Sequence, residues 1–285
     1  MPEPLIRNIS DTERWAAVFR AAETERPDPL FRDPLARRLA GERGEQIASA
    51  TEMQMHQRFS WSWVMRTYVF DQYIERALAN GVDTVLNLAA GLDARPYRMP
   101  VQPSLRWIEV DLPELLGYKE QLLASEKPRC QLERIPLDLS DVSRRRALFA
   151  QIGRSAKRVA VISEGLLLYL NPDDVGVLAS DLAAQPSFQY WIFDIVSPGL
   201  LEMLRKQGGG RELEQAGAPF QFAPAEGPGY FARYGWRPLH VQSTFKAAGR
   251  NGRLPWHMRI FSFLPESNGK QGKRPWGGLC LMERS

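Results

Sequence analysis

Residues 82–98 constrain the fold of this chain more than any other part of its sequence. They predict a short buried strand at residues 84–88 that runs directly into a turn of small residues, Ala89, Ala90 and Gly91. A second predicted strand at residues 105–110 leads to Asp111, 20 residues after Gly91. A turn without bulky side chains lets a ligand approach the backbone, and an acid at the end of the next strand can bind two ribose hydroxyls. The spacing therefore suits a nucleoside cofactor.

The turn does not carry the glycine-rich fingerprint of dinucleotide-binding folds. That fingerprint has three glycines beside a pyrophosphate, whereas residues 89–91 contain only Gly91. A missing phosphate cradle favours a nucleoside without phosphates, and S-adenosylmethionine is the common one. A nicotinamide-dependent oxidoreductase on a similar sheet is the competing interpretation, and the single glycine counts against it.

Short apolar segments alternate with helical patterns from residue 84 onward. This alternation predicts an α/β fold with a doubly wound, mostly parallel sheet that helices cover on both faces. Expected strands lie at residues 84–88, 105–110, 131–136, 158–163 and 188–195, and expected helices at residues 112–124, 142–151 and 173–184. The last third predicts further strands at residues 236–243, 257–263 and 279–282.

Residues 10–80 are predicted to be helical. Ser10 or Asp11 can cap a first helix that runs through Glu23. Pro34 suits the first turn of a second helix that ends at Gly41, and a longer helix then ends near residue 80.

Acids and small residues also follow the other expected strands, at the edge where open sheets of this kind bind ligands. Asp138 and Leu139 follow the third strand, and Glu164 follows the fourth. Taken alone, Asp138 could simply cap a helix, and Glu109 could be an ordinary surface acid. Such residues after four consecutive strands together favour a cofactor site.

Arg66 supports a cofactor site by a different route. It lies one turn before Phe70 on an apolar stripe that continues at helical spacing through Tyr73, Ile74, Ala77 and Leu78. A guanidinium on a buried face needs a partner, because an unpaired buried charge is very costly. The carboxylate at the methionine end of S-adenosylmethionine would bind it bidentately. An internal ion pair with an acid of the sheet is the alternative.

Composition matters mainly for what it excludes. The net charge of +4 comes from interleaved acids and bases, so we expect no nucleic-acid partner. Cys130 and Cys280 are too few for a disulfide framework or a zinc site, and we expect no metal. No apolar run reaches the length of a membrane span, and the N-terminus shows no signal-peptide pattern. We therefore expect no membrane partner and a cytoplasmic location.

In combination, these residues resemble the leucine carboxyl methyltransferase-like branch of the class I S-adenosylmethionine-dependent methyltransferases, which includes protein and polyketide carboxyl O-methyltransferases. The resemblance covers about residues 10–195 and implies a seven-stranded, Rossmann-like sheet. From the helical pattern we also expect a cap at residues 1–80 on a core at residues 81–285, with a lid segment near residues 198–235. The matching segments are Ser10-Asp-Thr12, Phe19-Arg-Ala-Ala-Glu23, Phe31-Arg-Asp-Pro-Leu-Ala36, Arg66-Thr67, Leu86-Asn-Leu-Ala-Ala-Gly-Leu-Asp-Ala-Arg95, Tyr97-Arg98, Glu109-Val-Asp111, Lys119, Asp138-Leu139 and Glu164-Gly-Leu-Leu-Leu-Tyr-Leu170.

The resemblance implies roles for the matched residues. Arg66 would bind the methionine carboxylate of the cofactor, with Arg20 as a second cation. The turn of Ala89, Ala90 and Gly91 would give access to the methionine end. Asp111 would bind the ribose hydroxyls, and Asp138 with Leu139 would frame the adenine. Glu164 would face the methionine ammonium or close the floor of the pocket.

Two positions depart from the family pattern. The first residue of the turn is Ala89 where many relatives have glycine, which still leaves room for a ligand. Protein carboxyl methyltransferases carry an arginine directly after the Asp-Leu pair, and here that residue is Ser140. The second difference disfavours a peptide C-terminus as the methyl acceptor.

For methyl transfer, the protein mainly has to align a nucleophile with the sulfonium methyl group in a pocket that excludes water. A carboxylate needs no general base, whereas a phenol or amine does. His56, His240 and His257 form no recognisable dyad, which favours methyl ester formation on a small molecule over methylation of a hydroxyl. Tyr169 is the best candidate for a substrate contact, with ordinary helix packing as the alternative.

Two further questions stay open at the level of sequence. Because methyl transfer needs no diagnostic catalytic residue, the sequence also allows a protein that binds S-adenosylmethionine without catalysis. The chain is expected to be a monomer or a homodimer.

Overall fold

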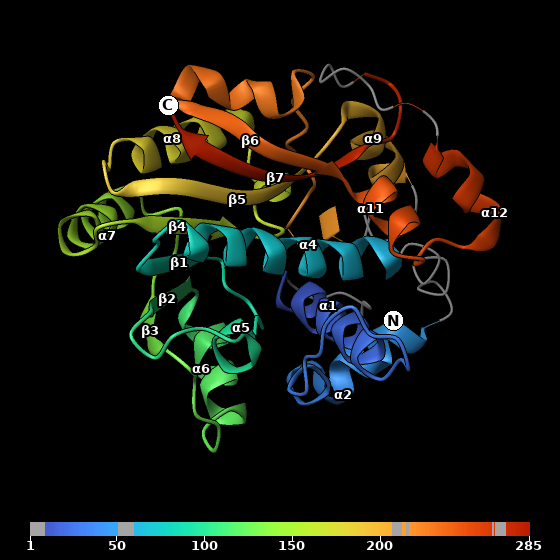
Figure 1. The fold of residues 1–285 in the computed structure, drawn as a ribbon, viewed down its shortest axis with the longest axis horizontal. Coiled ribbons are helices and arrows are strands. Elements are labelled where there is room, and N and C mark those ends of the chain that lie inside the picture. The colour runs from blue at the N-terminus through green and yellow to red at the C-terminus, as the bar shows by residue number, and fades with distance from the viewer. Residues whose placement is uncertain (1–8, 51–59, 207–212, 215–216, 264, 266–271) are drawn as a thin grey trace.

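The computed structural model describes residues 9–50, 60–206, 213–214, 217–263, 265 and 272–285 of the chain. The strands are β1 (Thr84–Leu88), β2 (Arg106–Asp111), β3 (Gln131–Pro136), β4 (Val159–Ser163), β5 (Phe188–Val196), β6 (Trp236–Ser243) and β7 (Gly277–Arg284). They form one seven-stranded sheet in the order β3-β2-β1-β4-β5-β7-β6 (Figure 1). Strands β1 to β5 pair in parallel, whereas β7 runs antiparallel to both β5 and β6.

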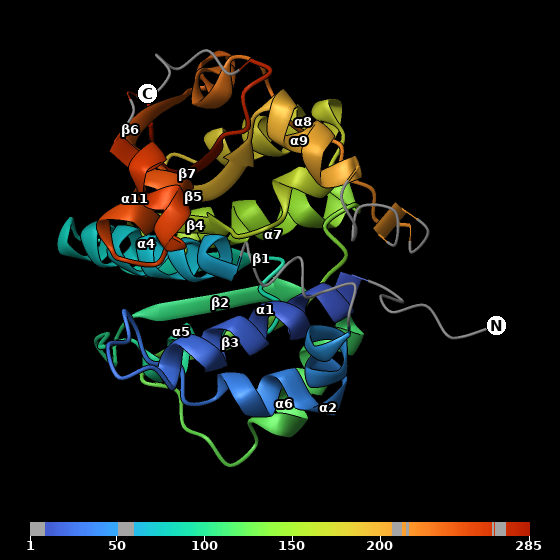
Figure 2. The same cartoon turned by 90° about the vertical axis from the view of Figure 1, so that its right-hand side faces the viewer.

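Two hydrophobic cores lie on opposite faces of the sheet. In β1, Val85 packs on one face while Leu86 and Leu88 pack on the other, because successive side chains of a strand point to opposite sides. Helices α4 (Ser60–Ala79) and α11 (Thr244–Arg250) cover the first face, and α7 (Val142–Ser155) and α8 (Pro172–Ala183) cover the second (Figure 2). The predicted doubly wound α/β fold is thereby confirmed.

Helices α1 (Ile9–Thr24) and α2 (Ala36–Ser49) pack on the segments that follow β1 and β2 (Figure 1). Ala17 of α1 and Leu39 of α2 share a third core with Leu92 and Leu115, which come after those strands. This packing places α1 over the carboxyl ends of the central strands. The other described elements are α5 (Arg95–Arg98), α6 (Pro113–Leu122), η2 (Leu167–Tyr169), α9 (Pro198–Lys206), η3 (Gly227–Tyr234), α12 (Trp256–Arg259) and η4 (Ile260–Phe263).

Seven of the expected strands are confirmed, with ends that differ from the prediction by at most two residues. The expected strand at residues 257–263 is wrong, because α12 and η4 occupy this segment. The side chains of Trp256, Ile260, Phe261 and Phe263 are exposed, so no sheet face buries this apolar run. Periodicity alone does not separate a strand from a short helix in such a run.

The helix ends also differ from the prediction in several places, and α7, for example, runs to Ser155 where the sequence predicted an end at residue 151. Element α2 runs to Ser49, but Gly41 within it has a non-helical backbone with a φ of 61°, so the predicted break at Gly41 is present as a kink between two helical stretches. Helix α1 begins at Ile9, so Asp11 lies in its first turn and not at the cap, where its charge still favours the helix dipole. Among the described helices, none combines the length and the apolar character of a membrane span.

Candidate functional site

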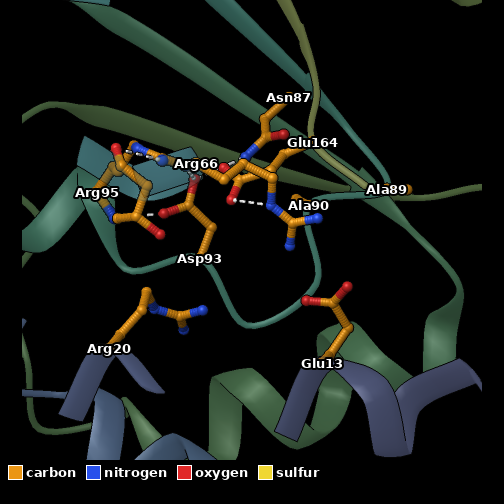
Figure 3. Close-up of a pocket in the computed structure, with 10 residues that line it drawn as sticks. Glu13, Arg20, Arg66, Asn87, Ala89, Ala90, Asp93, Arg95 and Glu164 are labelled. Carbon is orange, nitrogen blue, oxygen red and sulfur yellow. Dashed lines mark hydrogen bonds and ion pairs between the residues drawn. The ribbon is translucent and has the colours of Figure 1, made fainter. Parts of the chain in front are cut away.

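A cavity lies at the ends of β1 and β4, between the turn that follows β1 and helix α1 (Figure 3). The structure brings five predicted site residues together in it: Arg20, Arg66, Ala89, Ala90 and Glu164. The full lining consists of Glu13, Arg20, Arg66, Thr67, Asn87, Ala89, Ala90, Asp93, Arg95 and Glu164.

The turn after β1 holds a strained alanine. Ala89 has a φ of 51° and is the one non-glycine residue of the described chain with a positive φ, and Gly91 has a φ of 47°. A left-handed backbone costs an alanine about 1–2 kcal/mol, whereas a glycine adopts it freely. Ala89 therefore strains the backbone of the turn. The sequence alone indicated only that its small side chain leaves room for a ligand.

Asp111 at the end of β2 fixes this turn. Its Oδ2 accepts a hydrogen bond from the Gly91 N–H at 2.7 Å, and its Oδ1 accepts one from the Leu112 N–H, also at 2.7 Å. Burial raises the pKa of Asp111, although the two backbone donors oppose the shift. The carboxylate of Asp111 therefore has a structural role that the sequence did not reveal, and each of its oxygens keeps a further lone pair for a ligand.

Asn87, the fourth residue of β1, presents an unsatisfied acceptor to the cavity. Its Nδ2 donates to Asp93 Oδ2 at 2.9 Å, whereas its buried Oδ1 has no partner among the described residues. Buried polar atoms are rarely left without a hydrogen bond. The Asn87 Oδ1 atom therefore suits a ligand that donates a hydrogen bond.

Arg66 of α4 forms the internal ion pair that was the alternative to a cofactor contact. Its Nε lies 3.0 Å from Glu164 Oε1, and its Nη1 lies 3.5 Å from Asp194 Oδ2. Its Nη2 donates to no described residue, so the guanidinium keeps donors for an anion in the cavity. The ion pair and a ligand contact are thus compatible in this geometry.

Arg95, at the start of α5, joins the walls of the cavity. It is 2% exposed, and its guanidinium lies 2.7 Å from Asp71, 2.9 Å from Asp93 and 2.7 Å from Glu164. Burial opposes the charged form of Asp93, yet the Arg95 charge prevails and lowers the pKa of Asp93 to about 2. Sequence reasoning assigned no role to Arg95, although it stands within the family motif that follows β1.

Arg20 ties α1 to the same turn. It is buried, its Nε pairs with Asp33 Oδ2 at 3.0 Å, and its Nη2 donates to the Leu92 carbonyl oxygen at 2.7 Å. Because Leu92 directly follows Gly91, this contact holds the helix over the turn. Arg20 also lines the cavity, as the resemblance implied for a second cation.

The residues after β3 lie outside the cavity lining. Asp138 is exposed, and its Oδ1 accepts a hydrogen bond from the Ser140 N–H at 2.8 Å, which is a local turn contact. Leu139 is half-buried against the core beneath α7. A contact of either residue with adenine stays a prediction.

Tyr169 lies beside the cavity in an aromatic cluster that we define as Trp15, Phe19, Trp63, Tyr169 and Phe220. Its ring centroid is 5.4 Å from that of Phe220, and the guanidinium of Arg66 stacks 4.6 Å from the centre of the Trp63 ring. Burial raises the pKa of Tyr169 to about 12, and the charge of Glu13 adds to the shift. The cluster forms an apolar wall next to the charged cavity.

The described histidines lie elsewhere. His240 is on β6, with its ring centroid 6.4 Å from that of Tyr73, and His257 is exposed on α12. Neither lines the cavity, and His56 falls outside the described residues.

The strand order and the cavity define a class I methyltransferase fold. Two solved structures share it across almost their whole length. A protein from Thermobifida fusca YX described as a methyltransferase is 17% identical with a TM-score of 0.59, over 99% of this chain and 96% of its own. A DUF574 family protein from Streptomyces avermitilis MA-4680 is 18% identical with a TM-score of 0.54, over 95% of this chain and 97% of its own.

Sequence comparison gives the family within this class. The leucine carboxyl methyltransferase family model matches residues 14–183. A relative from Parafrankia sp. (strain EAN1pec) is 30% identical over 90% of this chain and 86% of its own, and one from Streptomyces coelicolor is 33% identical over 77% and 80%. Both relatives have S-adenosyl-L-methionine-dependent methyltransferase activity ascribed to them by name. The chain belongs to the leucine carboxyl methyltransferase family and is an S-adenosylmethionine-dependent methyltransferase.

The strain at Ala89 generates a stability prediction. Ala89→Gly should raise the free energy of unfolding by up to about 1 kcal/mol, since relief of the left-handed alanine outweighs the extra entropy of an unfolded glycine. Urea denaturation measures the change. Ala90→Gly is the matched control, and because Ala90 has no positive φ it should destabilise the protein by about 0.5–1 kcal/mol. Equal destabilisation by both variants would contradict the strain.

Proposed function

We propose that this methyltransferase acts on an oxygen atom of a small molecule, and that it prefers a carboxylate to a hydroxyl as the acceptor. The match of residues 14–183 to the leucine carboxyl methyltransferase family carries this proposal, and no histidine of the described residues lines the cavity. A carboxylate is already a nucleophile at neutral pH, whereas a hydroxyl needs a general base within hydrogen-bond reach.

The polar lining of the cavity supports the proposal that it binds the methionine end of S-adenosylmethionine. Its ammonium would donate to the orphaned Oδ1 of Asn87, and its carboxylate would bind the remaining donors of Arg66 and Arg20. The turn of Ala89, Ala90 and Gly91 would admit this end of the molecule, because it presents only a backbone and two methyl groups. Glu164 would close the floor of the pocket through its pairs with both neighbouring arginines. When bound, the cofactor supplies an electrophilic methyl group.

The nucleoside end would follow the sheet edge from β1 toward β3. Asp111 would bind the ribose hydroxyls with the lone pairs that Gly91 and Leu112 leave available. Asp138 and Leu139 would frame the adenine, since β3 lies next to β2.

The acceptor would lie against the aromatic cluster, where Tyr169 is the candidate contact. Apolar walls around a few polar groups are typical of small-molecule pockets. Ser140, exposed after β3, offers no guanidinium for a peptide carboxylate, which favours a small molecule over a protein. We propose that α1 and α2 belong to a cap over this pocket and that residues 198–235 contribute its lid. We also propose a monomer or homodimer that needs no nucleic-acid partner.

Methylation of a hydroxyl is the second candidate, and one observation favours it. The carboxylate of Glu13 faces the cavity, and burial raises its pKa to about 7 despite the opposing charges of Arg66 and Arg20. A carboxyl group with this pKa could serve as a general base near neutral pH.

Asp111→Ala tests the ribose site. S-adenosylmethionine should bind about 10- to 100-fold more weakly, because the variant loses a charge-assisted contact worth about 1.5–3 kcal/mol. The melting temperature should also fall, since the Gly91 and Leu112 N–H groups lose their acceptor. Calorimetric titration measures binding, with Asp141→Ala as a control that removes only the cap of α7. Wild-type affinity in folded Asp111→Ala protein would refute the ribose contact.

Arg66→Lys separates ligand binding from internal pairing. Lysine keeps the charge but loses the planar fork, so cofactor affinity should fall about tenfold. Calorimetry and thermal melting on the same sample measure the two effects. A lower melting temperature with unchanged cofactor affinity would restrict Arg66 to its ion pairs with Glu164 and Asp194.

The pH dependence of kcat at saturating cofactor distinguishes the two acceptors. A carboxylic acid with a pKa near 4 is ionised throughout, so its methylation rate should stay flat between about pH 6 and 9. A hydroxyl methylated with base assistance should give a rate that rises with pH in that range. A screen of small acids and phenols supplies the substrates, and a steep rise would overturn the preference for carboxylates.

A further inference from the structure

Glu13 is an acid of the cavity lining to which the family resemblance assigned no role. It lies on α1, and its carboxylate points from the helix toward the turn after β1 (Figure 3). A Cβ on Gly91 would overlap this carboxylate, so Glu13 lies directly against the face of the turn that only a glycine leaves open.

The carboxylate of Glu13 has no fixed partner. Among the described residues, none forms an ion pair or a hydrogen bond with it. The two nearest cations are committed elsewhere, since Arg20 pairs with Asp33 and Arg66 pairs with Glu164 and Asp194. A carboxylate in this position would gain much from a cationic ligand.

The charges around the cavity give Glu13 a distinct electrostatic role. Without it, the lining holds three arginines (Arg20, Arg66 and Arg95) and only two acids (Asp93 and Glu164). These arginines are already paired, because Asp33, Asp71 and Asp194 contact them from outside the lining together with Asp93 and Glu164. Among the described lining residues, the carboxylate of Glu13 is therefore the acid left unpaired for a positive ligand. S-adenosylmethionine carries a sulfonium cation, whereas its product S-adenosylhomocysteine carries a neutral thioether in the same place. A negative charge facing this position would therefore bind the methyl donor more tightly than the product.

We infer that Glu13 is a specificity residue for the cofactor, whose carboxylate stabilises the sulfonium form and so favours S-adenosylmethionine over S-adenosylhomocysteine. This inference rests on the proposed function, because it requires the methionine end to lie in this cavity. The three rotatable bonds of the side chain let the carboxylate turn aside from Gly91 while α1 stays in place.

The discrimination depends on pH. Burial raises the pKa of Glu13 to about 7, so its protonated form is well populated at slightly acid pH and its charged form prevails above neutrality. A sulfonium binds the charged form better, and the preference for S-adenosylmethionine should therefore increase with pH. The charged and titratable groups that face Glu13 are Arg20, Arg66, Asp111, Glu164 and Tyr169.

Calorimetric titration of both ligands tests the inference without measuring turnover. In Glu13→Gln at about pH 7.5, the Kd of S-adenosylmethionine should rise about tenfold, while that of S-adenosylhomocysteine should change less than about twofold. Glu25→Gln is the matched control, because it removes the same charge from an exposed acid just after α1. It should change neither affinity, and thermal melting verifies that each variant is folded.

A pH series adds a readout that a purely structural role would not move. Between about pH 6 and 8, the ratio of the two Kd values should shift toward S-adenosylmethionine in the wild type and stay constant in Glu13→Gln, which also corrects for titration of the ligands. Equal weakening of both ligands, or no change in either, overturns the inference. Unchanged binding with a turnover rate reduced about a hundredfold would instead make Glu13 the general base. If Asp111→Ala and Arg66→Lys both leave the two affinities unchanged, the proposed site itself fails.

Discussion

The cavity depends on one buried guanidinium. Arg95 contacts carboxylates from three separate elements, namely Asp71 of α4, Asp93 of the turn and Glu164 after β4. Arg95 is 2% exposed, and an unpaired charge at such a buried position is very costly. Removal of any one of these carboxylates would therefore leave part of the guanidinium without a partner. The network therefore fixes α4, the turn after β1 and the end of β4 relative to one another, and these elements form most of the cavity wall.

The same network explains why two acids of one cavity have opposite pKa shifts. Asp93 has Arg95 within ion-pair distance, which lowers its pKa to about 2 despite burial. Desolvation raises the pKa of Glu13 in the same space to about 7, because it outweighs the opposing charges of Arg66 and Arg20. The protein thus contains a permanently charged acid that serves the structure and an acid near its titration point that faces the ligand. Such a difference is typical of functional sites.

The sheet and part of the site follow from local sequence patterns. The strands were predictable because short apolar segments between helical patterns are encoded over a few residues, and their carboxyl ends assigned Glu164 and the turn of Ala89 to one edge. Arg66 was assigned from the helical spacing of its apolar stripe. Arg95 and Glu13 could not be found in this way, since their roles depend on contacts between segments distant in the chain. The error at residues 257–263 has a related cause, because only tertiary packing decides whether a short apolar run is buried in a sheet.

The turn also shows why structural and binding roles cannot be divided among separate residues here. The two carboxylate oxygens of Asp111 accept hydrogen bonds from the N–H groups of Gly91 and Leu112. These bonds hold the turn in a conformation that strains Ala89. The strain persists because the surrounding hydrogen bonds over-determine it. The carboxylate is consequently preorganised before any ligand arrives, with its remaining lone pairs directed away from the two N–H groups. A residue that shapes the turn and also faces the ligand couples cofactor affinity to the stability of the sheet edge.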